Sequence, residues 1–401
     1  MRFPEFEGEW KNTRLGEIAN FTKGKGISKS DIDERGNIEC IRYGELYTHY
    51  GEIINEIKSR TYTNISNLVL SESNDVIIPA SGETAIDIAT ASCVLKSGVA
   101  LGGDLNIIKT ENDGVFLSFY LNSKKKMEIA NLAQGISVVH LYSSQLASLS
   151  LNLPKIDEQN KISNFLTLLI KRIDTQSKII QRLESLMKGF TMNILKQKIR
   201  FENVQENNFN SWEFKKLSQV CVEHQLKNTK KESNEVFSVA KHKGVINQIE
   251  HLGRSFSAKD IAHYKLVYPG DLVYTKSPTS EFPYGIIKQN RTGRIGVVSP
   301  LYCVFRPKTF ALGYLLHEYF NSSVNTFNYL NPLVQKGAKN TMNINNNDFL
   351  NGAKLLLPTS EKEQSFIFIF LNSIAQKIQT EKAILEQFEK QKKYLLQQMF
   401  I

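Results

Sequence analysis

The same apolar repeat occurs twice in this chain, at an offset of 205 residues. From Ile162 and again from Ile367, apolar residues recur in alternating steps of four and three, and the first polar residue falls at the same place, Gln176 and Glu381. This spacing over four heptads predicts a coiled-coil seam. Two unrelated amphipathic helices would not explain why the polar layers coincide. The predicted seam residues are Ile162, Leu166, Leu169, Ile173, Ile180, Leu183, Met187, Ile367, Leu371, Ile374, Ile378, Leu385, Phe388 and Leu395.

Each repeat opens with Leu-Pro followed by Glu-Gln, in "LPKIDEQ" (153–159) and "LPTSEKEQ" (357–364). The proline is expected to close a strand, with Asp157 or Ser360 capping the helix that follows. Each helix should run about 40 residues, or about 60 Å. Because the first helix leads from one domain into the next, the second is expected to return along it. That antiparallel pairing would hold two domains at opposite ends and bring "MRFPEF" to "LLQQMFI".

Other landmarks repeat at nearly the same offset. Trp10 matches Trp212, "NDVIIPASGET" (74–84) resembles "GDLVYTKSPTS" (270–280), and mixed short β-type runs and helical stretches lie between them. The sequence therefore predicts an α+β protein built by tandem duplication, with two similar globular domains separated by two long helices in a pseudo-twofold arrangement. The expected divisions are 1–152 for the first domain, 153–200 for the central helix, 201–356 for the second domain and 357–401 for the last helix.

Composition narrows the class of protein. The chain has 401 residues and a formal charge of +10, with a net charge of −3 over residues 12–152 and +7 over 201–357. A positive excess favours a polyanionic partner such as nucleic acid. The four cysteines are scattered and there is no long apolar run, so a reduced cytoplasmic protein without a membrane span is expected.

On the motifs "RFPEFEGEW", the two Leu-Pro/Glu-Gln helix starts and the endings "LMKGFTMNIL" and "YLLQQMF", the whole chain resembles the DNA-specificity subunit of type I restriction–modification systems. The resemblance implies two target-recognition domains, each reading one part of a split site in double-stranded DNA. It also implies docking of two methyltransferase (modification) subunits and of restriction translocase/endonuclease subunits. One departure from the seam pattern is Lys392, which predicts weaker packing there.

Catalytic motifs are missing from the sequence. "KGKGISKS" lacks Walker A spacing, "NPLV" is not an amino-methyltransferase motif, and no metal-ligand pattern occurs. We therefore expect a non-enzyme with no cofactor and no metal. Two alternatives stay open: a coiled-coil scaffold that joins two protein-binding domains, and a fused enzyme such as a nuclease. The scaffold leaves the positive charge unexplained, and the nuclease needs a carboxylate cluster that the sequence does not provide.

Three loops in each domain are candidates for DNA contact, although lysine-rich loops, β-turns and Asn-rich caps are also common without a ligand. Lysines would bind phosphates, and short polar side chains would read base edges. The first loop of each domain offers Lys23, Lys25 and Lys29, and Lys227, Lys230 and Lys231. The second offers Ser81, Glu83 and Thr84, and Lys276, Ser277 and Thr279. The third offers Ser137 and His140, and Lys336, Lys339 and Asn340.

Overall fold

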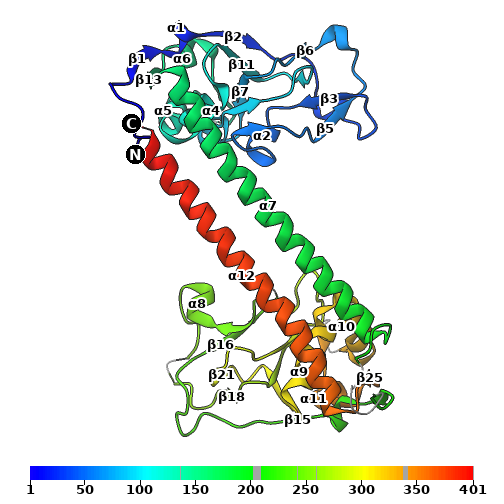
Figure 1. Ribbon diagram of the computed structural model, residues 1–401. Helices are drawn as coiled ribbons and strands as arrows, with labels where there is room; N and C mark the ends of the chain where they lie inside the picture. Colours follow the sequence, from blue (N-terminus) through cyan, green and yellow to red (C-terminus); the bar gives the residue numbers. More distant parts are fainter. Residues whose placement is uncertain (136, 202–208, 242, 259, 337–341, 401) are drawn as a thin grey trace. The chain divides into compact units, whose positions relative to one another are not determined.

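The computed structural model describes residues 1–135, 137–201, 209–241, 243–258, 260–336 and 342–400. The chain divides into two compact units: unit 1 consists of Met1–Ile179 with Glu381–Ile401, and unit 2 of Ile180–Thr380. Two long helices, α7 (Ile156–Leu195) and α12 (Glu361–Met399), each contribute one part to each unit (Figure 1). Each unit therefore combines a mixed α+β region with parts of both helices.

Unit 1 is built on two mixed sheets. The larger sheet has the order β2-β11-β7-β9-β4, in which β11 and β7 are central and antiparallel. Its strands are β2 (Ala19–Lys23), β11 (Leu105–Thr110), β7 (Asp75–Pro79), β9 (Ser92–Val94) and β4 (Ile53–Ile54). The smaller sheet has the order β5-β3-β10-β6. Its strands are β5 (Ser59–Thr61), β3 (Ile38–Ile41), β10 (Ala100–Leu101) and β6 (Val69–Leu70).

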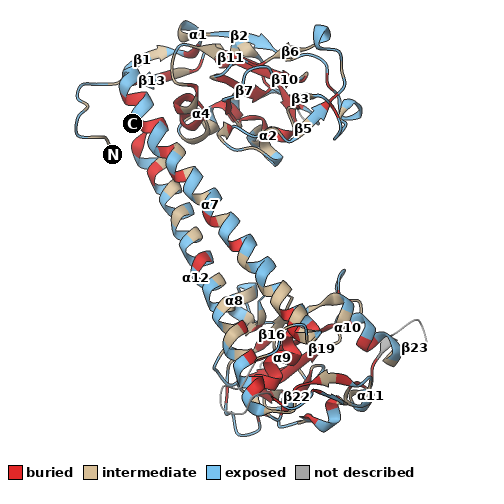
Figure 2. Ribbon diagram, turned by 45° about the vertical axis from the view of Figure 1, so that its right-hand side comes forward, coloured by how far each residue is buried: buried red, intermediate tan, exposed pale blue. Residues whose placement is uncertain are grey.

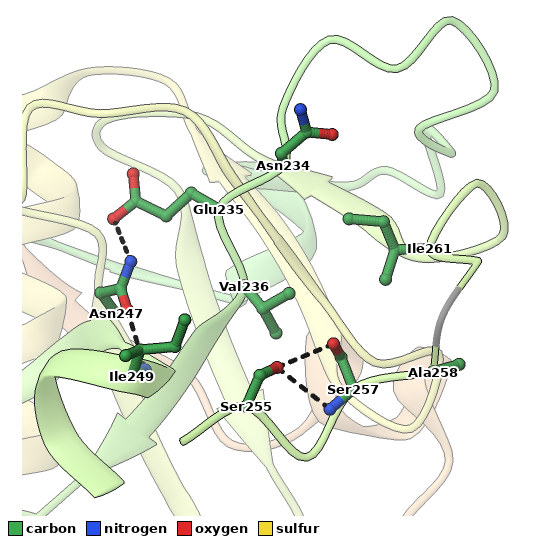
Figure 3. Close-up of a pocket in the computed structure, with 9 residues that line it drawn as sticks. All are labelled: Asn234, Glu235, Val236, Asn247, Ile249, Ser255, Ser257, Ala258 and Ile261. Atoms are coloured by element: carbon green, nitrogen blue, oxygen red, sulfur yellow. Dashed lines mark hydrogen bonds between the residues drawn. The ribbon is translucent and has the colours of Figure 1, made fainter. Parts of the chain in front are cut away.

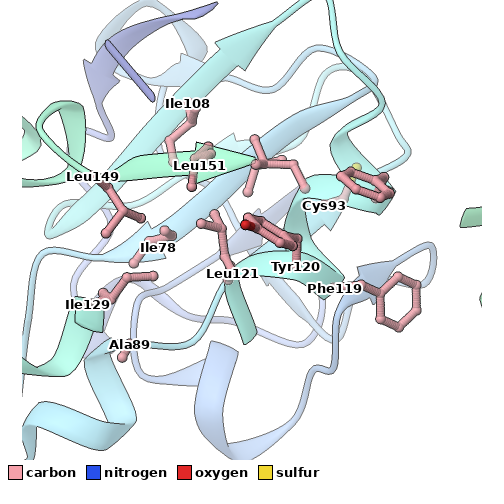
Figure 4. Packing of buried hydrophobic residues seen from close by; sticks show 14 of the residues in the cluster. Ile78, Ala89, Cys93, Ile108, Phe119, Tyr120, Leu121, Ile129, Leu149 and Leu151 are labelled. Atoms are coloured by element: carbon pink, nitrogen blue, oxygen red, sulfur yellow. The ribbon is translucent and has the colours of Figure 1, made fainter. Parts of the chain in front are cut away.

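The alternation of side chains along β7 separates two hydrophobic clusters of unit 1. Figure 2 colours β7 as buried. Val76 and Ile78 pack with Phe116 and Tyr120 of α4 (Gly114–Ser123), and Figure 4 labels Ile78 and Tyr120 of this cluster. Ile77 belongs to a second cluster with Leu101. Successive strand residues point to opposite faces, so a strand buried on both sides must be apolar throughout. This explains the uninterrupted apolar run "VIIP" (76–79) of β7, which follows Asp75.

The remaining elements of unit 1 are short. A two-stranded sheet pairs β1 (Lys11–Arg14) with β13 (Ser150–Leu153), and a second pairs β8 (Ser81–Gly82) with β12 (Val139–His140). The other helices are α1 (Leu15–Ile18), α2 (Glu45–Thr48), α3 (Ala85–Ile88), α5 (Lys126–Leu132) and α6 (Ser143–Ala147), with 3-10 turns at Lys29–Asp31 and Ile65–Asn67.

Unit 2 repeats the central strands of unit 1. Its main sheet has the order β15-β22-β19-β20, and α9 (Phe310–Asn321) follows β22 as α4 follows β11. The strands are β15 (Cys221–Glu223), β22 (Cys303–Pro307), β19 (Leu272–Thr275) and β20 (Ile286–Gln289). Four two-stranded sheets pair β14 (Glu213–Lys215) with β25 (Leu355–Leu357), β16 (Phe237–Ala240) with β17 (Gly244–Asn247), β18 (Lys265–Val267) with β21 (Gly296–Val298), and β23 (Gln335–Lys336) with β24 (Met342–Asn343). The other helical elements are α8 (Gln248–Leu252), α10 (Ser323–Leu330) and α11 (Asn346–Asn351), with 3-10 turns at Leu217–Gln219 and Asn331–Leu333. The predicted α+β tandem duplication is confirmed.

The Glu-Gln pair at the start of each long helix ties the helix to the strand and helix around it. Gln159 donates its side-chain amide to the carbonyl of Pro154 at 2.9 Å, and Gln364 does the same to Pro358 at 3.0 Å. The glutamine oxygens accept from the residues that cap α4 and α9: the Asp113 amide at 3.1 Å and the Thr309 hydroxyl at 2.6 Å.

The glutamates of the same pairs each bind an arginine. Arg2 donates to both oxygens of buried Glu158 at 2.7 Å, and Arg200 donates to both oxygens of buried Glu363 at 3.1–3.2 Å. The prediction that Asp157 caps the first helix is wrong. That helix begins at Ile156, so Asp157 lies inside its first turn, whereas the Ser360 hydroxyl accepts from the Glu363 amide at 3.4 Å.

Within each unit α7 and α12 pair in antiparallel fashion, which confirms the predicted coiled coil. In unit 1, Ile162, Leu166 and Leu169 share a core cluster with Leu395 and Met399. In unit 2, Ile194, Ile367 and Leu371 share a cluster against which Met187 packs. Ile180 is also buried, while seven predicted seam residues are half-buried: Ile173, Leu183, Met187, Ile374, Ile378, Leu385 and Phe388.

The polar layer of the seam is buried and hydrogen-bonded. The Gln176 amide donates to the Glu381 backbone carbonyl at 3.1 Å and also to its carboxylate, and both side chains lie inside unit 1. Lys392 of the seam has a partner within the chain, which its departure from the apolar pattern did not predict. Its ammonium lies 2.9 Å from the Glu52 carboxylate, so the lysine links α12 to the globular part of unit 1. As expected, the two termini meet, because the Met1 amine donates to the Gln398 carbonyl.

Candidate nucleic-acid interface

In unit 1, the three candidate loops meet at one end of the larger sheet. Lys23, the last residue of β2, pairs with Asn106 near the start of β11, which lies beside Ile78 near the end of β7. The loop 81–84 continues from β7. Residues 139–141 reach the same place, because β12 pairs with β8 and the Asn106 side chain donates to the Leu141 carbonyl at 2.9 Å. Sheet order therefore assembles three segments that are distant in sequence.

The exposed side chains at this end are of two kinds. The first is cationic: Lys23, Lys25 and Lys29 are all exposed. The second is polar or aromatic: Glu83, Ser137 and His140 are exposed, and the His140 ring stacks on Tyr142 with centroids 6.4 Å apart. The set can meet phosphates and base edges, as duplex recognition requires.

Two of the predicted residues in unit 1 have local roles. Ser81 is buried in β8, so its hydroxyl does not face solvent. Thr84 caps α3: its hydroxyl accepts from the Asp87 amide at 3.1 Å and donates to the Asp87 carboxylate at 2.6 Å. The capping contacts explain the choice of threonine at position 84 without a ligand, and Thr84 is exposed as well.

In unit 2, the first loop lies along β18. The backbones of Lys227 and Lys265 form an isolated antiparallel β-bridge. The Asn228 amide donates to the Tyr264 carbonyl at 2.9 Å. Lys227, Lys230 and Lys231 are exposed, and Lys231 has a left-handed backbone (φ 56°). The loop thus presents three cations on a fixed backbone.

The structure describes the second loop of unit 2 and only part of the third. Half-buried Lys276 follows β19, while Ser277 and Thr279 are exposed, and the Thr279 hydroxyl accepts from the Phe282 amide at 3.2 Å. At the same sheet end, Asn346 of α11 accepts from the Cys303 thiol at 2.8 Å and donates to Glu223 at 2.7 Å. The backbone of Lys336 lies in β23. Lys339 and Asn340 lie outside the residues that the structure describes.

Sequence reasoning missed a buried ion-pair group in unit 2. Asp271, at the start of β19, lies 2.9 Å from His224 and 2.9 Å from Arg306, whose guanidinium covers the Tyr268 ring at 4.8 Å. Burial alone would raise the pKa of Asp271, but hydrogen bonds from His224, Arg306 and the Tyr268 amide lower it below its usual value. The corresponding residue of unit 1, Asp75, pairs with Lys109 at 3.3 Å, and burial raises its pKa. A "turn, Asp, apolar strand" pattern in both halves was the available signal.

Sequence reasoning also missed a pocket in unit 2 beside the first loop. It has a volume of about 350 Å³ and lies between residues 234–236, which lead into β16, and residues 255, 257, 258 and 261 (Figure 3). Its lining mixes apolar and amide or hydroxyl groups: Asn234, Glu235, Val236, Asn247, Ile249, Ser255, Ser257, Ala258 and Ile261. Because these residues are spread over 28 positions of sequence with no motif, only the fold could place them together.

Other chemistry is limited in the described part of the chain. There, no group of three or more His, Cys, Asp or Glu side chains is placed to hold a metal ion. The four cysteines are free and buried, and burial raises the pKa of Cys40 to about 11 and that of Cys93 to about 12. Such thiols are protonated at neutral pH and act as core residues. Among the described residues, no helix is both long and apolar enough to cross a membrane.

Two α+β units of one plan, each with exposed lysine-bearing loops and a share of a helix pair, define a class of internally duplicated, modular protein. The family model of the type I restriction modification DNA specificity domain matches residues 7–185. Residues 7–185 belong to that domain family, and the resemblance inferred from the sequence is confirmed.

Solved structures of low sequence identity share the fold over the whole chain. The type-I restriction-modification system S subunit from M. genitalium aligns with a TM-score of 0.61 and 14% identity, covering 100% of this chain and 99% of that one. A chain from a structure on complex assembly and conformational transition of the type I R-M system aligns with a TM-score of 0.52 and 16% identity, covering 99% and 98%.

Proposed function

We propose that this chain is a DNA-specificity subunit that recognises a bipartite duplex site, with one half-site bound by the globular part of each unit. The observation that carries the proposal is the duplication: a DNA specificity domain matches residues 7–185, and unit 2 repeats its strand order. Because the loops of the two units differ in sequence, the two half-sites should differ as well.

The chain is proposed to act without chemistry of its own. It would direct methyltransferase and restriction translocase/endonuclease subunits of the same system to the site. Both units leave apolar helix residues in solvent that could receive such partners: Phe165 and Leu168 in unit 1, and Phe366 and Ile369 in unit 2. Each phenylalanine rests against another aromatic ring, Phe3 at 5.8 Å and Phe209 at 6.0 Å. Exposed apolar groups of this kind favour protein contacts.

The function can be tested by co-expressing the chain with its methyltransferase partner and mapping methylated adenines in the DNA. We expect one split motif of two unlike parts, which disappears when the chain is omitted. The purified chain alone should not consume S-adenosylmethionine. Methylation that is independent of the chain would instead support a scaffold, and turnover by the chain alone would show an enzyme.

The phosphate contacts can be tested with charge-matched variants. Replacing Lys227, Lys230 and Lys231 by alanine should weaken binding to all DNA sequences and reduce the salt slope of binding by up to about 3, because each phosphate contact contributes about 0.9. The control replaces Lys171, Lys178 and Lys188, which are exposed on α7. An equal effect in the control would show that only total charge matters.

A further inference from the structure

Each unit contains an equivalent chain segment that links two strands. It lies in sequence between the lysine-bearing first loop and the strands of the central sheet. In unit 1, β10 pairs parallel with β3 and antiparallel with β6. In unit 2, β21 bridges Val236 in parallel fashion and pairs antiparallel with β18. The chain between β3 and β6 therefore corresponds to the chain between β16 and β18.

Each of these connections carries an exposed aromatic residue with apolar neighbours. Tyr62 is 60% exposed and Ile65 is 54% exposed in unit 1. Phe256 is 59% exposed in unit 2, where Ile249 and Leu252 of α8 are also exposed. We call residues 59–65 and 248–256 the aromatic segments. Single exposed apolar residues are common on proteins. Exposure alone therefore does not indicate a ligand, but the position of these segments beside the first loop does.

In each unit, hydrogen bonds connect the chain that carries the aromatic segment to the first loop. In unit 1, the Thr61 hydroxyl donates to the Asp31 carbonyl at 2.7 Å, and Thr61 bridges Ile32. In unit 2 the link is indirect. Ala258, two residues beyond the aromatic segment, donates its amide to the Tyr264 hydroxyl at 3.3 Å, and the Tyr264 carbonyl accepts from the Asn228 amide of the first loop at 2.9 Å. In each unit, the chain that carries the exposed aromatic ring is therefore tied to the backbone of the loop that carries the candidate phosphate-binding lysines.

The chemistry around the rings matches a polyanion with planar bases. The Arg254 guanidinium covers the Phe256 ring at 4.5 Å, and Arg60 is half exposed two residues before Tyr62. The pocket of Figure 3 borders the aromatic segment of unit 2 and offers amide and hydroxyl groups at Asn234 and Ser257. Cations beside an aromatic ring suit phosphates and stacked or edge-on bases, whereas a protein partner would gain little from the surrounding lysines.

We propose that Tyr62 and Phe256 are specificity-determining residues, each lying against the bases of the half-site that its own unit reads. The proposal rests on the proposed function and adds a fourth recognition segment to each unit.

The experiment uses the full chain with its methyltransferase subunits and the target defined by methylation mapping. The variants are Tyr62→Ser and Phe256→Ser, and Phe214→Ser is the control because Phe214 is also exposed, on β14. Binding is measured on the intact target, on targets altered in one half-site or the other, and on unrelated DNA. Each aromatic variant should lose about tenfold or more on the intact target and lose discrimination at one half-site, a different one for each variant.

Three results would overturn the inference. Affinity and discrimination like those of Phe214→Ser would show that the aromatic segments do not read DNA, and uniform weakening on all DNA would assign them to phosphate contact alone. Loss of complex assembly with intact DNA discrimination would assign the segments to a protein partner. Unfolding midpoints of the variants should match the wild type. If the wild-type complex shows no split site, the proposed function fails rather than this inference.

Discussion

A buried aspartate precedes or begins a central strand in each unit, and its partners differ. Asp271 accepts from His224, Arg306 and a backbone amide, and these bonds hold its pKa below 3.8 despite burial. Asp75 has Lys109 and one backbone amide, and there burial prevails and raises the pKa. The pKa of the aspartate at this duplicated position is therefore lowered in unit 2 and raised in unit 1.

This contrast predicts different pH dependences. A carboxylate with a lowered folded pKa stabilises the fold above its unfolded pKa, and that stability is lost as pH falls through the folded value. Asp271→Asn should therefore cost about 1–2 kcal/mol of unfolding free energy at pH 7, and the difference from wild type should shrink below pH 3.8. Asp75→Asn should cost less at pH 7, because its raised pKa makes the charged form the disfavoured one.

The measurement can be made unit by unit. The chain has two tryptophans, Trp10 in unit 1 and Trp212 in unit 2. In a Trp10→Phe background, denaturant unfolding followed by fluorescence reports on unit 2 and thus on Asp271. In a Trp212→Phe background it reports on Asp75. Equal pH profiles for the two substitutions would contradict the assigned directions.

At the scale of the element, the polar layer of the helix pair links one residue on each helix. Gln176 and Glu381 are both buried, and the Gln176 side-chain amide donates hydrogen bonds to the backbone carbonyl and the carboxylate of Glu381. A buried polar pair costs stability compared with leucine, but it opposes any register in which its members face apolar residues. The polar layer therefore fixes the register in which α7 and α12 pair.

A double-mutant cycle tests this role. Gln176→Leu alone should lower the unfolding free energy by roughly 1–3 kcal/mol, because Glu381 loses the amide that serves it. Gln176→Leu with Glu381→Leu should recover that loss or exceed wild type. Thermal unfolding gives the energies, and cross-linking between helices shows whether the double variant still adopts one register. Additive losses would mean that the two residues do not act as a pair.

At the scale of the whole molecule, the duplication, the helices and the central strands could be predicted because periodicity and turn residues are local signals. β7, β11, β19 and β22 all fall in the apolar runs that predict strands. The site could be predicted only as separate loops. The pairing of β8 with β12, the pocket and the aromatic segments depend on sheet order, which no local pattern carries. Lys392 was misjudged because its partner, Glu52, is distant in sequence.

The helices can be tested as a ruler for the gap in the DNA site. One heptad inserted after Ile180 and one after Lys377 would face each other in the antiparallel pair and leave Gln176 opposite Glu381. Each helix gains about 10 Å, so the gap between half-sites should grow by about three base pairs. Sequencing of methylated sites decides the question. An unchanged gap, or changed bases within a half-site, would show that the helices do not set the spacing.

The two units are nested in sequence, and this has a consequence for synthesis on the ribosome. Unit 2 is one continuous stretch, whereas the core of unit 1 is completed by Leu395, Met399 and Phe400, whose ring packs 5.5 Å from both Phe116 and Tyr120. Domains usually close in the order in which they emerge. Here residues 1–179 cannot complete their core until residues 381–400 have emerged, so the nascent segment 1–179 should need chaperone protection until then.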